Sequence, residues 1–321
     1  MRSQILKLLK QHQHISGQRI ADGLKISRSA VWKHVKGLRG SGYQIRSAPG
    51  YGYSLVGIYD RIIPEEISID LGTRFMGKHI VYYDEVNSTQ DVADRLARQG
   101  GEEGLMILAG KQNRGRGRKG RPWLSPDVGG IYLSLILRPN VKPVNAVQIP
   151  MVAGVSMVKA IREVSGLPAQ IKWPNDINIG RKKVAGILTE INCELDRVNH
   201  IILGIGINVN TKSALLKVEQ NTATSIRDEL GRKVSRIALI RKFLEDFEHD
   251  YMCFLHDGLK PMLEEWKVFN NTLGSAVRIL DGDKEIRGMA LGLDEEGFLL
   301  IEDAAGGVHK VICGDVSLRK E

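Results

Sequence analysis

Six cations and four glycines alternate in one short stretch of this sequence, GKQNRGRGRKGRPW at residues 110–123, which ends on a proline and a tryptophan. Arginine presents planar pairs of N–H donors that suit carboxylate and phosphate, and glycine lets the backbone fold closely around a ligand. Taken alone, such a stretch is a nucleic-acid patch, a targeting signal, a solvated loop or a cradle for a small anion. The surrounding sequence decides among these four interpretations.

Apolar, strand-like runs flank this stretch, GLMILAG before it and GGIYLSLILRP after it, so it connects two buried strands. Connections this long in compact domains are commonly functional. Outside residues 1–58 the chain holds 36 basic and 36 acidic residues, and this balance disfavours a second nucleic-acid surface. We therefore interpret the stretch as an anion cradle in which Arg116 and Arg118 bind the ligand and Trp123 stacks on a flat heterocycle.

Further polar residues follow in KWPND, residues 172–176, where the proline ends a strand and Asn175 and Asp176 project from its end. Lys183 comes just before another strand, in which Gly186 permits the close approach of a ligand. Taken singly, Lys183 is more often a solvated side chain and Asp176 a turn former. Their occurrence together with the arginine loop favours a site for anionic substrates.

The excess positive charge lies at the N-terminus. Of 46 basic and 37 acidic residues, residues 1–58 hold ten basic residues and the single acidic residue Asp22, so this segment accounts for the whole net charge of +9. Neutralisation of phosphates is what such an excess serves. The charge therefore favours a DNA-binding domain over the alternative, a small helical protein–protein module.

Three helices and a hairpin are expected in this basic segment. SQILKLLKQH has a helical apolar pattern, and SGQRIADGLKISRSAVWKHVKGLRGSG predicts two more helices with Ser16 and Ser27 as N-caps. YQIRSAPGYGYSL alternates around a Pro-Gly turn signal, which predicts a wing. The pattern is typical of a winged helix-turn-helix.

The last of these helices divides as a recognition helix does. Val31, Val35 and Leu38 recur at helical spacing and are expected in the core, and Trp32 is interpreted as a packing residue. The residues expected to face DNA are Ser27, Arg28, Ser29, Lys33 and Lys36. Because a helix-turn-helix usually works as a dimer, another part of the chain is expected to supply a dimer interface.

Composition excludes several other classes. At 321 residues with 42% apolar residues the chain is long enough for two or three domains. The N-terminus is too polar for a signal peptide, and no window approaches the roughly 18 apolar residues of a membrane span, so a cytoplasmic protein without membrane contact is predicted. Cys193, Cys253 and Cys313 are far apart and are interpreted as buried free thiols.

Taken together, the motifs resemble those of bacterial biotin protein ligases. They are NST at 87–89, QNRGRGRKGRPW at 112–123, KWPND at 172–176, KVAGIL at 183–188 and GIGINVN at 204–210. With the winged helix, the whole chain is similar to the bifunctional form, a biotin ligase that is also the biotin operon repressor. It departs from the family pattern at Gln90, where Asn is frequent, and at Arg114, where a small residue is common.

The resemblance implies an α+β multidomain fold. Residues 1–58 are expected to form the winged helix-turn-helix, 59–272 a mixed-sheet α/β ligase domain like that of class II synthetases, and 273–321 a small SH3-like β-barrel. The sequence agrees independently, because short strand-like runs between 274 and 320 are separated by DGD, DEEG and AAGG, and 235–255 predicts a long amphipathic helix.

The resemblance also implies the reaction. The biotin carboxylate attacks the α-phosphorus of ATP in the presence of Mg²⁺, and a lysine of the biotin carboxyl carrier protein of acetyl-CoA carboxylase then attacks the biotinyl-adenylate. This intermediate is also the corepressor of a homodimer on the operator of the biotin genes. The implied catalytic cations are Arg116, Arg118 and Lys183.

The motif match assigns the remaining site residues. Those expected to bind biotin are Ser88, Thr89, Gln90, Gln112, Arg116, Gly117, Arg118, Lys183 and Gly186. Those expected to bind ATP or the adenylate are Arg121, Trp123, Lys172, Asn175, Asp176, Asn208 and Arg319, with Asp176 near Mg²⁺. Ser88 is also a candidate N-cap of the helix that follows it. Two other functions stay open, a lipoate ligase and a non-catalytic biotin-sensing repressor.

Overall fold

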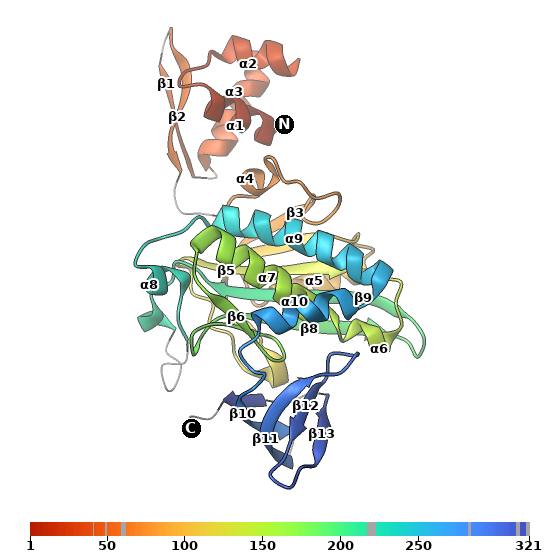
Figure 1. The fold of residues 1–321 in the computed structure, drawn as a ribbon. Helices are drawn as coiled ribbons and strands as arrows, with labels where there is room; N and C mark the ends of the chain where they lie inside the picture. The colour runs from red at the N-terminus through yellow and green to blue at the C-terminus, as the bar shows by residue number, and fades with distance from the viewer. Residues whose placement is uncertain are drawn as a thin grey trace. The chain divides into compact units, whose positions relative to one another are not determined.

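A computed structural model describes residues 1–40, 42–48, 50–58, 62–216, 223–281, 284–312 and 315–318. Arg319, Cys313 and the proline of the predicted wing turn, Pro49, lie outside the described residues. The chain divides into two compact units, Met1–Gly72 and Thr73–Glu321. The first unit contains α1 to α4 with β1 and β2, and the second contains α5 to α10 with β3 to β14 (Figure 1).

The N-terminal unit is a winged helix-turn-helix, as predicted. Its helices and its antiparallel hairpin are α1 (Arg2–Gln11), α2 (Gly17–Leu24), α3 (Arg28–Gly40), β1 (Tyr43–Ala48), β2 (Gly52–Ile58) and α4 (Pro64–Ser68). Both predicted N-caps are confirmed, because the hydroxyls of Ser16 and Ser27 accept hydrogen bonds from the N–H groups of Arg19 and Ala30 at 3.1 Å. Gly52 has φ of +83°, and a Cβ there would lie 2.3 Å from the Ile15 carbonyl oxygen, so the wing requires glycine.

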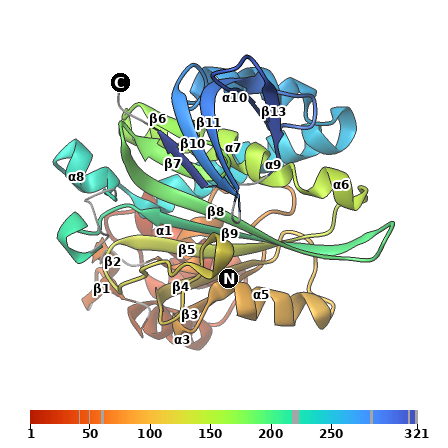
Figure 2. The ribbon, with the colours of Figure 1, turned by 90° about the horizontal axis from the view of Figure 1, so that it is seen from below.

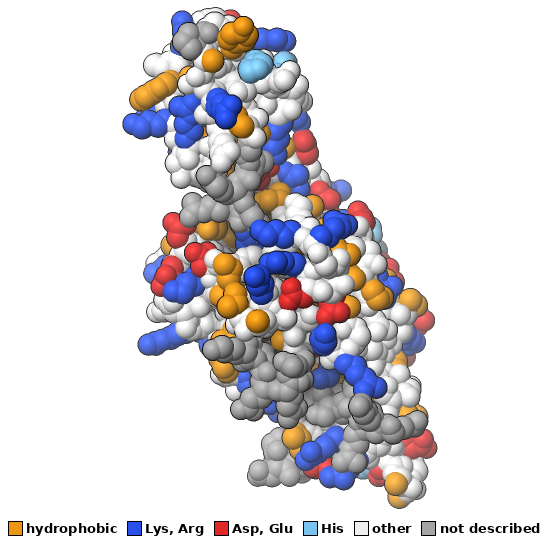
Figure 3. Space-filling view, turned by 90° about the vertical axis from the view of Figure 1, so that its left-hand side faces the viewer, with side chains coloured by type: hydrophobic (Ala, Val, Ile, Leu, Met, Phe, Trp, Pro, Cys, Tyr) orange, Lys and Arg blue, Asp and Glu red, His pale blue; other side chains and the backbone are white. Residues whose placement is uncertain are grey.

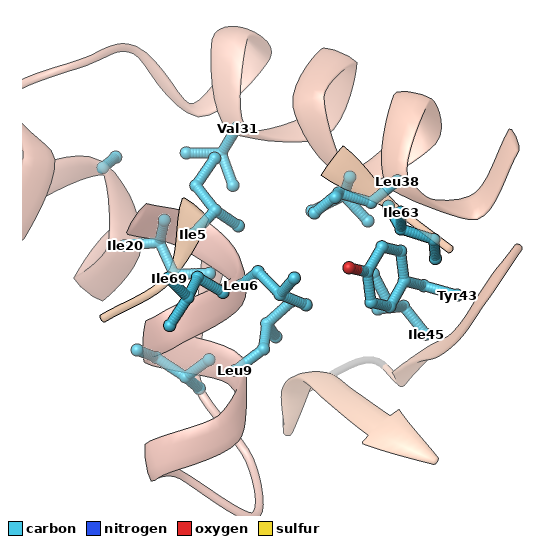
Figure 4. Close-up of a cluster of buried hydrophobic side chains, with 13 residues drawn as sticks. Ile5, Leu6, Leu9, Ile20, Val31, Leu38, Tyr43, Ile45, Ile63 and Ile69 are labelled. Atoms are coloured by element: carbon cyan, nitrogen blue, oxygen red, sulfur yellow. The ribbon is translucent and has the colours of Figure 1, made fainter. Parts of the chain in front are cut away.

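Apolar side chains of α1, α2, α3 and β1 meet in one core (Figure 4), and Tyr53 and Leu55 of β2 pack against it. The predicted core residues Val31, Val35 and Leu38 are buried. Ile63 and Ile69, from the segment around α4, belong to the same cluster. The N-terminal unit therefore includes α4, which follows the predicted limit at residue 58; the three predicted domain limits themselves stay predictions.

A seven-stranded mixed sheet forms the centre of the second unit. Its strand order is β3-β4-β5-β9-β8-β7-β6, in which β3 and β4 pair in parallel and all other neighbours are antiparallel. The strands are β3 (Ile80–Val86), β4 (Met106–Gln112), β5 (Gly130–Leu137), β6 (Ala169–Lys172), β7 (Asp176–Ile179), β8 (Lys182–Cys193) and β9 (Val198–Asn208). Lys183, expected just before a strand, is the second residue of β8.

Helices cover both faces of this sheet. Figure 2 shows α5 on one face and α7 and α9 on the other. The helices are α5 (Thr89–Arg98), α6 (Pro143–Ala146), α7 (Ile149–Ser165), α8 (Ile226–Leu230), α9 (Arg236–Asp257) and α10 (Lys260–Phe269), with 3₁₀ turns at Arg118–Gly120 and Ser213–Leu215. The long helix predicted over 235–255 is confirmed as α9, which Ser235 caps through the Ala238 N–H at 3.1 Å.

One apolar stretch passes the length and composition test for a membrane span, contrary to the expectation that no window approaches one. It is Pro143–Ser165, which covers α6 and α7, and 72% of its most apolar window is buried inside the protein. Because α7 packs between the sheet and α9, apolar residues occupy most of its circumference. The stretch is a core helix of the second unit.

The chain ends in a five-stranded antiparallel sheet. Its order is β13-β12-β11-β10-β14, from β10 (Ala276–Asp281), β11 (Lys284–Leu293), β12 (Leu299–Glu302), β13 (Val308–Val311) and β14 (Asp315–Leu318). The carboxylates of Asp294 and Asp303 each accept two backbone hydrogen bonds in the turns that begin with them. The predicted strands are confirmed, and closure into an SH3-like barrel stays a prediction.

The two cysteines within the described residues are free, but the expectation that they are buried is wrong. Cys193 is exposed at the last position of β8, and Cys253 is half-buried on α9. Distance in sequence correctly excluded a disulfide between them. It carried no information on burial, which depends on which flank of each element faces the core.

Candidate functional site

A cavity of about 350 Å³ in the second unit gathers nearly all the predicted site residues. It lies between the start of α5, the loop after β4, and β7, β8 and β9. The predicted residues that line it are Ser88, Thr89, Gln90, Gln112, Arg116, Gly117, Arg118, Arg121, Trp123, Asn175, Asp176, Lys183, Gly186 and Asn208. Lys172, the last residue of β6, is not among the described lining residues.

The loop between β4 and β5 folds back on itself beside this cavity. The Trp123 N–H donates to the Gly115 carbonyl at 2.8 Å, and the Gly117 N–H donates to the Arg121 carbonyl at 2.7 Å. A Cβ at Gly115 would lie 2.5 Å from the Trp123 carbonyl oxygen, so the two arms of the loop approach each other only with glycine there. The glycines thus let the loop return close to its start and bring Trp123 to the cavity.

Polar groups at the start of α5 form one end of the cavity. Ser88 caps the helix, as predicted, by accepting a hydrogen bond from the Gln90 N–H at 3.3 Å. The Gln112 side-chain oxygen accepts from the Thr89 N–H at 2.8 Å and from the Thr89 hydroxyl at 3.1 Å. Because these groups are held by one another, this end presents preorganised hydrogen-bonding groups to a ligand.

Two residues at this end were not predicted from the sequence. Ser134, fully buried on β5, donates to the Thr89 hydroxyl at 2.8 Å and to the Gln90 side-chain oxygen at 3.0 Å as alternatives. Glu190 on β8 accepts from the Gln90 side-chain nitrogen at 3.2 Å. Ser134 lies in an apolar strand and Glu190 two residues beyond KVAGIL, so only the strand register reveals them.

Two cations, Lys183 and Arg118, form a cationic end of the cavity beside Asn175 and Asp176, whereas Arg116 bonds side chains at the α5 end. The Lys183 Nζ lies 2.5 Å from the Asp176 carboxylate and 5.3 Å from the centre of the Trp123 ring. The Arg118 guanidinium donates to the Asn175 side-chain oxygen at 3.1 Å, and the Asn175 amide in turn donates to the Ile187 carbonyl at 2.6 Å. Asn175 and Asp176, which follow the strand break, therefore orient the two cations.

The side chain of Arg116, in the loop after β4, forms ion pairs with two carboxylates. It pairs with Asp91 on α5 and with Glu190, whose oxygens lie 3.1 and 3.2 Å from Nη2. Burial lowers the pKa of Arg116, but the hydrogen bonds to Asp91 and Glu190 outweigh it, so this pKa is raised from its usual value. Arg116 stays a cation at all physiological pH values.

Two glycines of β9, Gly204 and Gly206, leave the face of the strand beside the cavity without side chains. A Cβ at Gly204 would lie 2.7 Å from the Gln90 side-chain oxygen, and a Cβ at Gly206 would lie 2.4 Å from the Trp123 indole. The alternation of GIGIN points both glycines to the same face of the sheet. That alternation is the signal by which the sequence indicates a strand that other groups approach closely, here the side chains of Gln90 and Trp123.

Two polar atoms at the cavity are buried without a hydrogen-bond partner among the described residues. They are the Asn208 side-chain oxygen, an acceptor, and the Trp123 indole nitrogen, a donor. Leaving such groups unpaired costs free energy, of order 1–3 kcal/mol each. Their position in the cavity wall suits a ligand that carries both donors and acceptors.

The described residues contain no group of three or more His, Cys, Asp or Glu side chains that could hold a metal ion. Asp176 is the only acidic residue in the described lining of the cavity, and its carboxylate already pairs with Lys183. A metal here would have to take most of its ligands from a bound substrate, as Mg²⁺ commonly does with phosphates.

The N-terminal unit presents a basic helix surface. Figure 3 shows mainly Lys and Arg among the charged side chains of this unit, and both signs of charge over the second unit. The predicted DNA-facing residues on and before α3 are all exposed: Ser27, Arg28, Ser29, Lys33 and Lys36. Exposure of this set opposite the buried face is the division expected of a recognition helix.

Trp32 is not a packing residue of this unit, which corrects the sequence interpretation. Its side chain is 55% exposed, and the Lys36 Nζ lies 5.2 Å from the ring centre. It lies one position after the buried Val31, on the flank of α3 that also carries Arg28 and Lys36. Apolar character alone suggested burial, whereas helical geometry directs the ring to the basic face.

A basic helix-turn-helix followed by a mixed-sheet domain with a cationic cavity defines the class of DNA-binding regulators that also bind an anionic small molecule. Family models match the biotin/lipoate A/B protein ligase family at residues 82–208, a helix-turn-helix domain at 2–54 and the biotin protein ligase C-terminal domain at 272–319.

Relatives match over almost the whole chain. A bifunctional ligase/repressor BirA of Bacillus subtilis is 38% identical over 99% of this chain and 98% of its own length, and that of Escherichia coli is 30% identical over 98% and 96%. A biotin protein ligase from Aquifex aeolicus, solved with biotin and ATP, is 32% identical with a TM-score of 0.65, covering 76% of this chain and 100% of that one. The chain belongs to the biotin/lipoate A/B protein ligase family, among the bifunctional ligase/repressors.

Proposed function

We propose that this chain activates biotin with ATP, transfers the biotin to a lysine of a biotin carboxyl carrier protein, and represses the biotin genes with biotinyl-adenylate as corepressor. The observation that carries the proposal is the convergence of loop cations, amides and hydroxyls on one cavity, in a chain with an exposed basic recognition helix. The relatives with all three parts are named ligase/repressors. ATP, carrier protein and operator DNA are cytoplasmic, and there we place the chain.

The first step forms a bond between a biotin carboxylate oxygen and the α-phosphorus of ATP, and pyrophosphate leaves. In the second, the acceptor amine attacks the biotinyl carbonyl carbon, AMP leaves and the amine loses a proton. Both partners of the first step are anions, so their approach requires fixed positive charge. Arg116, Arg118 and Lys183 supply that charge, and no covalent nucleophile on the protein is needed.

The two ends of the cavity suggest the orientation of the substrates. The hydrogen-bonding end at α5 suits the ureido head group of biotin, through Ser88, Thr89, Gln90 and Gln112. The cationic end suits the carboxylate and α-phosphate, with Gly117 and Gly186 leaving room for them. We assign Arg121, Trp123, Lys172, Asn175, Asp176, Asn208 and Arg319 to the nucleotide, with Trp123 against adenine.

Mg²⁺ is proposed to arrive with ATP. Asp176 is the candidate carboxylate because the other described residues of the cavity wall include no acid. The ion would supply further positive charge to the phosphates. For Asp176 to reach it, the ion pair with Lys183 must loosen, and this would free Lys183 for the substrate anions.

Biotin-dependent exchange of pyrophosphate into ATP tests the proposed reaction. We expect exchange with biotin and none with lipoate, because the head-group end offers several groups suited to a ureido ring. Equal exchange with lipoate would make the chain a lipoate ligase, and the absence of exchange with either acid, together with intact biotin binding, would make it a non-catalytic sensor. Labelling of a carrier protein's lysine tests the second step.

The loop connects the reaction to the proposed repressor. An adenylate would contact Arg116, Arg118 and Trp123 together and so order the loop from both arms. A partner that requires the ordered loop then binds more tightly. We propose that this partner is a second copy of the chain or, alternatively, the carrier protein.

A non-hydrolysable adenylate analogue should therefore tighten dimerisation and operator binding together, far more than ATP alone. Sedimentation and operator titration measure the two effects, and proteolysis between Arg114 and Arg121 reports loop order. Excess unmodified carrier protein should relieve operator binding when biotin and ATP are present, because it consumes the adenylate. If the analogue changes neither dimerisation nor loop cleavage, the loop is only a substrate cradle.

Gly206→Ala should raise the KM for ATP by about tenfold, because the added methyl would displace the Trp123 indole, and overpacking costs about 1–3 kcal/mol. The KM for biotin should change much less. Gly292→Ala in β11 is the control, since a Cβ there would meet nothing within 4 Å. An unchanged KM for ATP in Gly206→Ala would remove Trp123 from the nucleotide site.

A further inference from the structure

Glu190 lies where two proposed substrate contacts meet. Its carboxylate accepts a hydrogen bond from the Gln90 amide at 3.2 Å and bonds from Arg116 at 3.1 and 3.2 Å. Gln90 belongs to α5 and Arg116 to the loop, so a side chain of β8 joins the two. Glu190 is outside every motif on which the family resemblance rests.

The Gln90 side chain is held on both sides. It is 4% exposed, its oxygen lies 3.0 Å from the Ser134 hydroxyl, and Gly204 leaves room for that oxygen. An amide has an oxygen that accepts and a nitrogen that donates, and turning it over exchanges them. The hydroxyl of Ser134 donates or accepts and therefore suits both orientations.

Glu190 suits only one of the two orientations. An ionised carboxylate accepts hydrogen bonds and cannot donate them, so it pairs with the Gln90 nitrogen and repels the Gln90 oxygen. One of the two amide N–H groups is used in this way. The second is available to an acceptor on the ligand, and the ureido carbonyl of biotin is such an acceptor.

We propose that Glu190 is a positioning residue for the biotin head group: it fixes the direction of the Gln90 amide and, with the same carboxylate, holds Arg116 of the loop. This inference rests on the proposed function. It assigns to Glu190 an effect on biotin that acts through Gln90, and a smaller effect on ATP.

Glu190→Gln is the sharpest variant, because it keeps the size of the side chain but allows it to donate as well as accept. The Gln90 amide then loses its preferred direction. We expect the KM and the Kd for biotin to rise about tenfold, as for loss of a charged hydrogen-bond partner, with a smaller change in the KM for ATP. Glu190→Ala serves as a second variant, and thermal melting checks the fold of both.

A double-mutant cycle tests whether Glu190 acts through Gln90. The probe is biotin methyl ester, which keeps the head group but has no carboxylate for Arg116. Glu190→Gln should weaken its binding about tenfold in the natural chain and less than twofold in a Gln90→Ala background. Asp91→Asn is the matched control, because it removes the charge of the other partner of Arg116, and the Asp91 carboxylate bonds Arg116 and not the Gln90 amide; it should leave ester binding within twofold.

Each result has one consequence. Equal losses of ester binding in both backgrounds would show that Glu190 acts through Arg116 or through the fold. No loss in either background would show that Glu190 does not position the head group. Both results overturn the inference, and biotin exchange by the natural chain would still uphold the proposed function. A natural chain that binds neither biotin nor its ester overturns the proposed function, and this inference with it.

Discussion

Lys183→Ala should lower biotin-dependent pyrophosphate exchange by at least a hundredfold while the protein stays folded. The Lys183 ammonium lies between the Asp176 carboxylate and the Trp123 ring, at the cationic end of the cavity. Removal of one well-placed group that stabilises a transition-state charge costs about 3–4 kcal/mol. Exchange rates at saturating biotin and ATP, with thermal melting of each variant, measure the effect.

A neighbouring residue provides the control. Lys182 precedes Lys183 on β8, but its ammonium pairs with Glu229 at 3.2 Å and its side chain is 53% exposed. Lys182→Ala should therefore leave exchange within about twofold, because exposed ion pairs contribute little. A near-normal rate in Lys183→Ala would assign the phosphate contact to another cation.

The freed Asp176 carboxylate offers a second explanation for such a loss, since it would repel the substrate anions. Asp176→Asn in the Lys183→Ala background removes that repulsion. Because Asp176 is also the proposed Mg²⁺ ligand, the double variant is compared with Asp176→Asn alone, and if the missing cation is the cause it should stay at least a hundredfold below that single variant. Recovery to near the rate of that single variant would instead make Lys183 a neutralising partner of Asp176.

Deletion of the N-terminal unit should abolish operator binding and leave adenylate formation intact. The excess charge lies within residues 1–58, whereas every described residue that lines the cavity lies beyond Thr73. The structure suggests a start at Thr73 in place of the residue near 58 that charge alone suggests. Ile63 and Ile69 are buried in the N-terminal core, and a start at 58 would leave them without it.

Two measurements test this separation. The full chain should lose operator affinity steeply as salt rises, with a slope near 0.9 per phosphate contact, and the shortened chain should show no specific binding. The full-length double variant Lys33→Ala, Lys36→Ala should lower the slope and keep normal exchange. Operator binding by the chain that starts at Thr73 would contradict the assignment of DNA recognition to the winged helix.

Residue type and spacing predicted those cavity residues for which the chemistry of an anionic ligand allows few residue types. The structure brings the polar residues of three short motifs to one cavity: Arg116, Arg118 and Arg121 of the arginine loop, Asn175 and Asp176 of KWPND, and Lys183. These residues lie close to glycine or proline in the sequence. Ser134 and Glu190 were not predicted because serine and glutamate are common everywhere. Their role depends on the register that sets β5 and β8 against β9, which the sequence does not state locally.

The fold shows a similar division. Helix α9 has an amphipathic pattern and an N-cap serine, and the wing has an alternating pattern around a turn signal. Both elements were predicted from these signals. Helix α7 is buried on most sides, which removes its periodicity and gives it the composition of a membrane span. Trp32 was interpreted as a packing residue because large aromatic side chains are mostly buried, but the structure leaves it 55% exposed.

The four tryptophans of the chain give each function an optical signal of its own. Trp32 is exposed on the recognition helix, Trp123 lines the substrate cavity, and Trp173 and Trp266 are buried in the second unit. Indole emission responds to solvent and to stacked rings, so with Trp173 and Trp266 replaced by phenylalanine the remaining fluorescence comes from the two sites of interest. Titration with nucleotide would then be followed at Trp123 and titration with DNA at Trp32, in one sample and without an added label.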